Sequence, residues 1–188
     1  MIIFGLGNPG LKYRWTRHNA GCIFLDRLAR HFRKKFVKSP YGSYATHRTR
    51  RAEVLLVKPS CWMNQCGDLI HEILTAERSD FLVVLDDINL PLGRMRMRSK
   101  GSDGGHRGLR SIIDGVGRND FPRLRIGVGR PSIDAAEYVL GRFSAAEKRV
   151  LRKVIREGIG GIEMLLVDGF EQAQNHINAI KIELDAGG

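Results

Sequence analysis

The sequence predicts a single α/β domain over residues 1–188, with a twisted mixed β-sheet flanked by helices. Three observations favour this class. Segments with strand-like patterns alternate along the chain with segments whose apolar residues recur at helical spacing. The run from Phe81 to Leu85 is continuously apolar, as expected of a central strand covered on both faces. No internal repeat, low-complexity tract or linker suggests a domain boundary.

The first half of the chain begins with a short buried strand over residues 1–4, followed by a glycine-rich segment over 5–10. Apolar spacing predicts a helix over residues 19–33, and the opposite face of this helix is basic at Arg27, Arg30, Arg33 and Lys34. Residues 43–49 and 53–57 have the pattern of two strands joined by a basic turn. A second helix is expected after Pro59.

In the second half, methionine and arginine alternate over residues 94–99, so the methionines should face the core and the arginines the other side. A helix is expected over residues 109–116 and a strand over 123–128. The C-terminal third should be helical, with capping boxes at Ser144 with Glu147 and at Asp168 with Glu171.

Charge is the most informative bulk property, because the net charge of +11 attracts polyanions over long range. Nucleic acid is the first candidate partner and an anionic membrane surface the second. No segment approaches the roughly 20 apolar residues of a membrane span. The apolar start lacks the basic region of a secretory signal, so we expect a cytoplasmic protein. The three cysteines match no common zinc or redox spacing and are expected to be free thiols.

Two segments near the N-terminus are candidates for part of a functional site. Gly5 to Gly10 matches the dinucleotide pattern G-x-G-x-x-G, but Pro9-Gly10 forms a turn pair where that motif requires a helix. We therefore favour a loop over a cofactor site. His18 follows this loop and has polar neighbours, in the kind of connection where site residues concentrate.

Three further segments carry polar groups at strand or helix ends. Asp86 and Asp87 follow the buried strand, where they could orient a histidine, bind a metal or cap a loop. Asn64 could cap a helix or donate into a cleft. The segment from Gly101 to Gly108 predicts a flexible loop that opens into a helix, and its exposed N–H groups would attract an anion.

Together these segments resemble the bacterial-type peptidyl-tRNA hydrolase family. The matching segments occur in the family's order and span most of the chain: residues 5–10, Tyr13, residues 16–21, Pro59 with Met63 and Asn64, residues 86–93, 104–108 and 123–129. Each match alone is weak, whereas the six segments in order, together with Tyr13, form a strong signal.

The resemblance implies hydrolysis of the ester between a peptide and the terminal ribose of tRNA, without a metal or cofactor. By position, His18 would be the general base, Asp86 its orienting carboxylate and Asn64 the donor to the attacked carbonyl. Asn8, Tyr13, Met63 and His106 would contact substrate. Arg107 stands where the family usually has Asn, and its guanidinium could instead bind a tRNA phosphate.

The residues support this chemistry by themselves. A histidine base oriented by a carboxylate can activate water for attack on an ester, and an amide N–H can stabilise the oxyanion. The serine motif G-x-S-x-G is absent, so we expect direct attack by water. The alternatives are a non-catalytic RNA-binding protein on the same fold and a nucleotide-binding oxidoreductase.

The expected partner is peptidyl-tRNA, bound at its acceptor end and its nascent peptide by a monomeric protein. A basic strip beside the site is the expected tRNA contact, and it comprises Arg94, Arg96, Arg98, Lys100, Arg107 and Arg110. The alternative for this strip is a solvated strand face.

Overall fold

The computed structural model describes residues 1–48, 53–131 and 133–183, which are built around one seven-stranded sheet of order β2-β3-β4-β1-β5-β7-β6. Its central strands are parallel: β1 (Ile2–Gly5), β4 (Glu53–Pro59), β5 (Phe81–Asp87) and β7 (Arg123–Gly127). Antiparallel strands complete both edges, with β2 (Val37–Ser39) and β3 (Gly42–Arg48) on one side and β6 (Met95–Arg98) on the other. The predicted mixed sheet is therefore confirmed.

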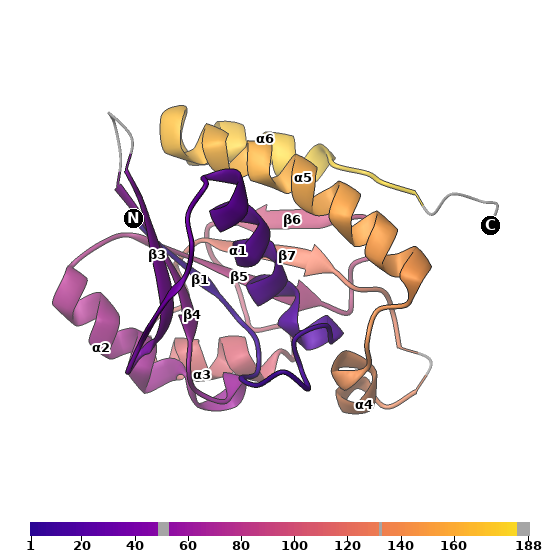
Figure 1. Ribbon diagram of the computed structural model, residues 1–188, viewed down its shortest axis with the longest axis horizontal. Coiled ribbons are helices and arrows are strands. Elements are labelled where there is room, and N and C mark those ends of the chain that lie inside the picture. The colour runs from indigo at the N-terminus through magenta and orange to yellow at the C-terminus, as the bar shows by residue number, and fades with distance from the viewer. Residues whose placement is uncertain (49–52, 132, 184–188) are drawn as a thin grey trace.

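Helices cover both faces of the sheet (Figure 1). One face packs against α1 (Ala20–His31), α5 (Ala145–Val167) and α6 (Phe170–Ala179), and the other against α2 (Gly67–Glu77) and α3 (Arg107–Val116). Strand side chains alternate between the two resulting cores, since Leu82 and Val84 join the first and Val83 the second. No helix among the described residues is long and apolar enough to cross a membrane.

Several local expectations are confirmed. Met95 and Met97 are buried while Arg96 and Arg98 are exposed. The capping box of α5 is formed as the sequence predicts: Ser144 accepts from the backbone N–H of Glu147, and the Glu147 carboxylate accepts from that of Ser144. Turns follow β1, so the glycine-rich segment does not open directly into a helix.

Other expectations are corrected. The second predicted capping box is wrong, because Asp168 ends α5 and α6 begins after Gly169 without a side-chain cap. Helix α2 begins at Gly67, since a turn and the 3-10 helix η2 (Met63–Gln65) occupy the residues after Pro59. Strand β2 and helix α4 (Ala135–Leu140) were not predicted. Residue 49, the last of the predicted strand 43–49, lies outside the described residues.

One close contact brings the start of α1 to the ends of the central strands. A Cβ atom at Gly21 would collide with the carbonyl oxygen of Val84 and the backbone nitrogen of Leu6. Glycine therefore lets the first turn of α1 lie directly on β1 and β5. The residues just before α1 consequently meet the carboxyl end of β5.

Candidate active site

His18 lies in the 3-10 helix η1 (Arg17–Asn19), between the turns after β1 and the start of α1. Asn19, which follows it, is buried and binds the backbone of Asn8 twice: Oδ1 accepts from its N–H at 2.9 Å, and Nδ2 donates to its carbonyl at 3.0 Å. Thr16 is also buried, and its hydroxyl donates to the Tyr13 carbonyl at 2.8 Å. Buried polar contacts thus hold the backbone on both sides of His18.

Arg17 ties the same segment to the C-terminal helices. Its Nη2 donates to both carboxylate oxygens of Glu147, at 2.8 and 3.1 Å, and its guanidinium carbon lies 4.3 Å from the centre of the Tyr138 ring. Burial raises the pKa of Glu147, but hydrogen bonds from Ser144 and Arg17 outweigh this effect and hold that pKa below its usual value. His18 therefore lies on a segment that is anchored from two directions.

Asp86 is the centre of the site. It is the penultimate residue of β5, and its side chain is 2% exposed. His18 Nδ1 lies 3.0 Å from Asp86 Oδ1 and 3.1 Å from Oδ2, while His106 Nε2 lies 3.0 Å from Oδ1. Burial raises the pKa of Asp86, but the two histidines outweigh it and lower that pKa well below its usual value.

The hydrogen-bond network assigns the tautomer of His106. The backbone N–H of Leu109 donates to His106 Nδ1 at 3.0 Å, which caps the N-terminus of α3. Because Nδ1 accepts, the proton of the neutral ring is on Nε2 and is donated to Asp86. His106 thus joins the start of α3 to the end of β5.

His18, Asp86 and His106 are close enough together to be considered as metal ligands. The protonated Nε2 of His106, however, has no lone pair to offer a cation while Leu109 donates to Nδ1. The three groups fit a hydrogen-bonded chain better than a coordination site. The remaining nitrogen of His18, Nε2, has no hydrogen-bond partner among the described residues and is free to act as a base.

These groups line a cleft of about 480 Å³ at the carboxyl ends of the central strands. Trp62, Met63 and Asn64 form one part of its wall, and residues of α4 form another. His106 and Arg107 line the same cleft. The structure therefore brings together the predicted residues His18, Asp86, Asn64, Asn8, Met63, His106 and Arg107.

The two asparagines of the cleft differ in how they are held. Asn8 Oδ1 accepts from the backbone N–H of Met63 at 3.1 Å, which fixes the orientation of the amide and leaves its Nδ2 hydrogens for a ligand. Asn64 is exposed, and the described residues provide it with no hydrogen-bond partner. Tyr13 is not among the cleft-lining residues; its ring packs edge-on against Trp62 at the rim, with 5.7 Å between centroids.

The glycine-rich loop before α3 is more firmly held than its composition predicted. Arg125 Nη2 donates to the carbonyls of Ser102 and Asp103, at 2.8 and 3.3 Å. The buried Arg123 donates to the Gly101 carbonyl, and burial lowers the pKa of this arginine to about 10. Arg125 also donates to Asp87 at 3.2 Å. The loop expected to be flexible is thus anchored to β7.

The basic strip is formed only in part. Arg96, Arg98 and Lys100 are exposed, on the α3 side of the sheet edge. Arg94 is half-buried beside residue 181, and Arg110 is paired with Asp103 at 2.8 Å. Arg125, which was not predicted as part of the strip, lies opposite Arg96 in the strand register and also lines the cleft.

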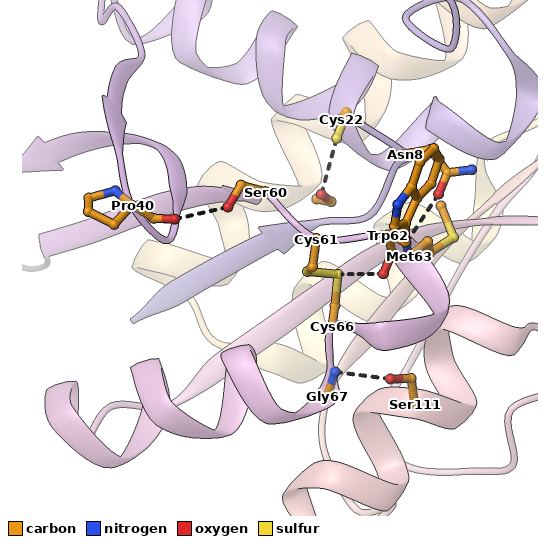
Figure 2. The surroundings of a disulfide bond; sticks show 11 residues. Asn8, Cys22, Pro40, Ser60, Cys61, Trp62, Met63, Cys66, Gly67 and Ser111 are labelled. Atoms are coloured by element: carbon orange, nitrogen blue, oxygen red, sulfur yellow. Dashed lines mark hydrogen bonds between the residues drawn. A yellow bond between two sulfur atoms is a disulfide. The ribbon is translucent and has the colours of Figure 1, made fainter. Parts of the chain in front are cut away.

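The prediction that all cysteines are free thiols is wrong. Cys61 and Cys66 form a disulfide (Figure 2). The residues between them, which include η2, supply Trp62, Met63 and Asn64 to one wall of the cleft. Only Cys22 is free, and burial raises the pKa of its thiol to about 12. Spacing alone did not reveal the pair, because the chain reverses through the short η2 turn.

Sequence reasoning also missed the α4 wall and Arg125. Asp134 caps α4 by accepting from the backbone N–H groups of Ala136 and Glu137, and Val139 and Leu140 face the cleft. The pairing of Asp134 with Glu137 three residues later is a helix-start signature that could have located α4. No comparable signal distinguishes Arg125 from its neighbours.

Comparison with known proteins agrees with this geometry. A family model described as "Peptidyl-tRNA hydrolase" matches residues 2–185. The peptidyl-tRNA hydrolase of Caldicellulosiruptor saccharolyticus is 42% identical over 181 residues, covering 94% of this chain and 96% of that protein. The one from Fervidobacterium nodosum is 42% identical over 184 residues, covering 97% and 98%.

Solved structures give the same result. A crystal structure of peptidyl-tRNA hydrolase in complex with n-propanol is similar with a TM-score of 0.91 at 31% identity, covering 97% of this chain and 96% of that one. Peptidyl-tRNA hydrolase from Acinetobacter baumannii is similar with a TM-score of 0.90 at 31% identity, covering 96% and 95%.

Proposed function

We propose that this chain, which belongs to the peptidyl-tRNA hydrolase family, cleaves the ester bond of peptidyl-tRNA with a water molecule activated by His18. The protein is an ester hydrolase, and its substrate class is peptidyl-tRNA. The observation that carries the mechanism is the contact between His18 Nδ1 and the buried Asp86 carboxylate, which leaves Nε2 free in the cleft.

In the proposed step, the Nε2 lone pair of His18 takes a proton from water while the water oxygen attacks the ester carbonyl carbon. Asp86 keeps the Nδ1 proton in place and stabilises the imidazolium that forms. The imidazolium then protonates the ribose oxygen as the carbon–oxygen bond breaks. A base positioned in this way contributes roughly 10²–10⁴ in rate.

Negative charge develops on the carbonyl oxygen during this attack, and amide donors can meet it. We assign this role to Asn64, which lies on the cleft wall, while Asn8 holds the adjoining peptide group through its free Nδ2 hydrogens. A well-placed donor of this kind contributes about 3 kcal/mol to the transition state.

The remaining substrate contacts follow the walls of the cleft. Met63 contacts the peptide, and Tyr13 supports the rim through Trp62. Arg107 is exposed at the first position of α3, where a helix N-terminus and a guanidinium together favour a phosphate of the acceptor end. His106 acts mainly through Asp86, although it lines the same cleft.

The tRNA body is proposed to lie along Arg96, Arg98 and Lys100, which continue from Arg107 and Arg125 on one side of the sheet edge. Arg94 and Arg110 belong to the same strip but contribute less, because Arg94 is half-buried and Arg110 is paired. The protein is proposed to act as a monomer. The proposed location is the cytoplasm, where tRNA is used.

Direct attack by water is favoured over a covalent intermediate by the composition of the cleft. Among the described residues that line it, none is serine, threonine, cysteine or lysine. Its aspartates are all engaged: Asp86 with the two histidines, Asp87 with Arg125, and Asp134 with the backbone of α4. Rapid-quench hydrolysis of peptidyl-tRNA, with the protein analysed by intact mass, tests this mechanism. We expect linear peptide release and unmodified protein; a burst accompanied by a peptidyl adduct on the protein would overturn it.

A further inference from the structure

The Cys61–Cys66 disulfide closes a small covalent ring in the chain just before α2 (Figure 2). We call residues 61–66 the cysteine ring. Trp62, Met63 and Asn64 all lie within it, and all three line the cleft. The covalent bond therefore acts on the backbone that carries one wall of the site.

Asn64 depends on this backbone more than the other polar groups of the site do. His18 and His106 are each oriented by hydrogen bonds to Asp86, and Asn8 is oriented by the Met63 N–H. Asn64 has no such partner among the described residues. Its position is thus set by the path of the main chain through η2.

Apart from the disulfide, few hydrogen bonds hold that path. The Gln65 N–H donates to the Trp62 carbonyl at 2.8 Å within the ring, and the Met63 N–H donates to Asn8. Just beyond the ring, the Gly67 N–H donates to the Ser111 hydroxyl at 3.0 Å. The segment is also held by the buried side chain of Met63 and by the edge-on contact of Trp62 with Tyr13, so opening the ring would return conformational freedom mainly to its exposed residues, Asn64 among them.

The two sulfur atoms have different surroundings. Cys66 is buried at the junction of η2 and α2, whereas Cys61 is only half-buried. Sγ of Cys66 lies 3.2 Å from the Trp62 carbonyl oxygen (Figure 2). In the disulfide this sulfur carries no proton, so the contact becomes a hydrogen bond only when the thiol is formed.

The difference in exposure between the two sulfur atoms determines which of them a reductant attacks first. The thiolate of a small dithiol attacks the more accessible Cys61 sulfur, and Cys66 leaves as a thiolate and takes up a proton. The second thiol of the reductant then attacks the mixed disulfide, releasing the Cys61 thiol and forming the cyclic disulfide of the reductant. Two electrons and two protons pass from the dithiol to the protein.

We infer that Cys61 and Cys66 are positioning residues for ester hydrolysis, whose reversible disulfide holds Asn64 where it meets the developing oxyanion. The inference rests on the role proposed above for Asn64. Donors to an oxyanion are effective only when they are already in place, and displacement by about 1 Å can cost roughly a hundredfold in rate. Reduction is therefore expected to lower kcat more than it raises KM.

The test uses the full chain in two redox states, prepared with and without a dithiol. Alkylation under denaturing conditions, followed by intact mass, should find one free thiol before reduction and three after it. Peptidyl-tRNA hydrolysis should then show a kcat that is lower by about tenfold in the reduced protein and restored on reoxidation.

A comparison with Asn64→Ala separates positioning from general stability. If the disulfide acts through Asn64, this variant has a low kcat that no longer responds to reduction, because the two changes are not additive. A response of undiminished size in Asn64→Ala overturns the inference, and so does an unchanged kcat in the reduced wild type. Three free thiols before reduction also overturn it.

Matched variants complete the experiment. Cys61→Ser should have the reduced kcat under all conditions, whereas Cys22→Ala should retain the redox response of the wild type. Thermal unfolding checks that Cys61→Ser is folded, and the reduced wild type gives the same information without mutation. If oxidised wild-type protein hydrolyses the ester but ignores reduction, this inference fails while the proposed function stands. No hydrolysis in either state would instead refute the proposed function.

Discussion

Nδ1 of His18 and Oδ1 of Asp86 lie 3.0 Å apart, although 68 residues separate them in the sequence. The carboxylate belongs to a central strand, and the histidine precedes the helix that packs closely on that strand through Gly21. His106 reaches the same carboxylate from the start of α3. One buried carboxylate thus orients two histidines that come from helices on opposite faces of the sheet.

Asp86→Asn should reduce kcat by roughly a hundredfold or more, because the amide places an NH2 donor where one carboxylate oxygen stood and, being neutral, stabilises the imidazolium poorly. Asp87→Asn is the matched control. Asp87 binds Arg125 and the backbone N–H of Asn89, so its replacement should have a smaller effect. Steady-state kinetics on both variants decide the assignment, and equal losses would refute the distinction between these neighbours.

His106→Ala should remove two interactions that can be separated by a second variant. Loss of the cap on α3 should lower the free energy of unfolding by about 1 kcal/mol. His106→Asn can restore the cap but not the bond to Asp86. We expect kcat to fall by roughly tenfold in both variants. Stability should fall further with alanine, because both variants lose the bond to the buried Asp86 but only alanine also loses the cap. A rise in KM with unchanged kcat would instead identify His106 as a substrate contact.

The Arg17–Glu147 pair should make stability depend on acid pH. The pKa of Glu147 is lowered in the folded protein, so its contribution is complete above the usual glutamate value and is lost as pH falls through the folded value. Glu147→Gln should therefore flatten the decline in unfolding free energy below about pH 4.5. Urea denaturation across this range measures the slope. Identical slopes in both proteins would show that the pair contributes nothing.

Arg98→Ala should weaken tRNA binding and reduce the slope of affinity against salt by about one unit. With about four phosphates neutralised, wild-type affinity should fall roughly a hundredfold between about 50 and 200 mM salt. Hydrolysis of a minimal peptidyl-nucleotide ester should hardly change. Equal damage to this small substrate would place Arg98 in the catalytic centre or the fold, and no effect on either substrate would make it a solvated residue.

A matched control for this prediction lies on the basic face of α1. Arg30 is exposed, and no described residue pairs with it. It lies on the other face of the sheet from Arg98. Arg30→Ala removes the same charge from the protein, so it should have a smaller effect on affinity. A larger effect of Arg30→Ala would move the tRNA-binding surface to α1.

Much of the fold follows from local pattern. The buried run that became β5 and the alternating residues of β6 were recognisable because strand periodicity is a local property. Helix α4 was missed because it is only six residues long and none of its residues is buried. Asp168 and Glu171 have capping spacing, yet Gly169, at a φ of 94°, occupies the N-cap position before α6 instead. The spacing of Asp168 and Glu171 could not reveal the backbone conformation that Gly169 adopts between them.

The sequence indicated which residues gather in the cleft, but not which of them contact one another. Sequence order placed Asp86 at a strand end, and only the packing of α3 shows that His106 also reaches it. The Cys61–Cys66 bond depends in the same way on the path of the chain through η2. Neither connection follows from residue spacing, because one joins two residues that lie 20 positions apart and the other needs a particular turn.

The proposed role of His18 is tested most directly by single-turnover hydrolysis of peptidyl-tRNA by His18→Ala, with tRNA affinity measured on the same preparation. Removal of the base should lower the rate of peptide release by at least about a hundredfold. Affinity should stay close to that of the wild type, because the basic strip and the fold are unchanged. Near-normal peptide release by folded His18→Ala would contradict the mechanism.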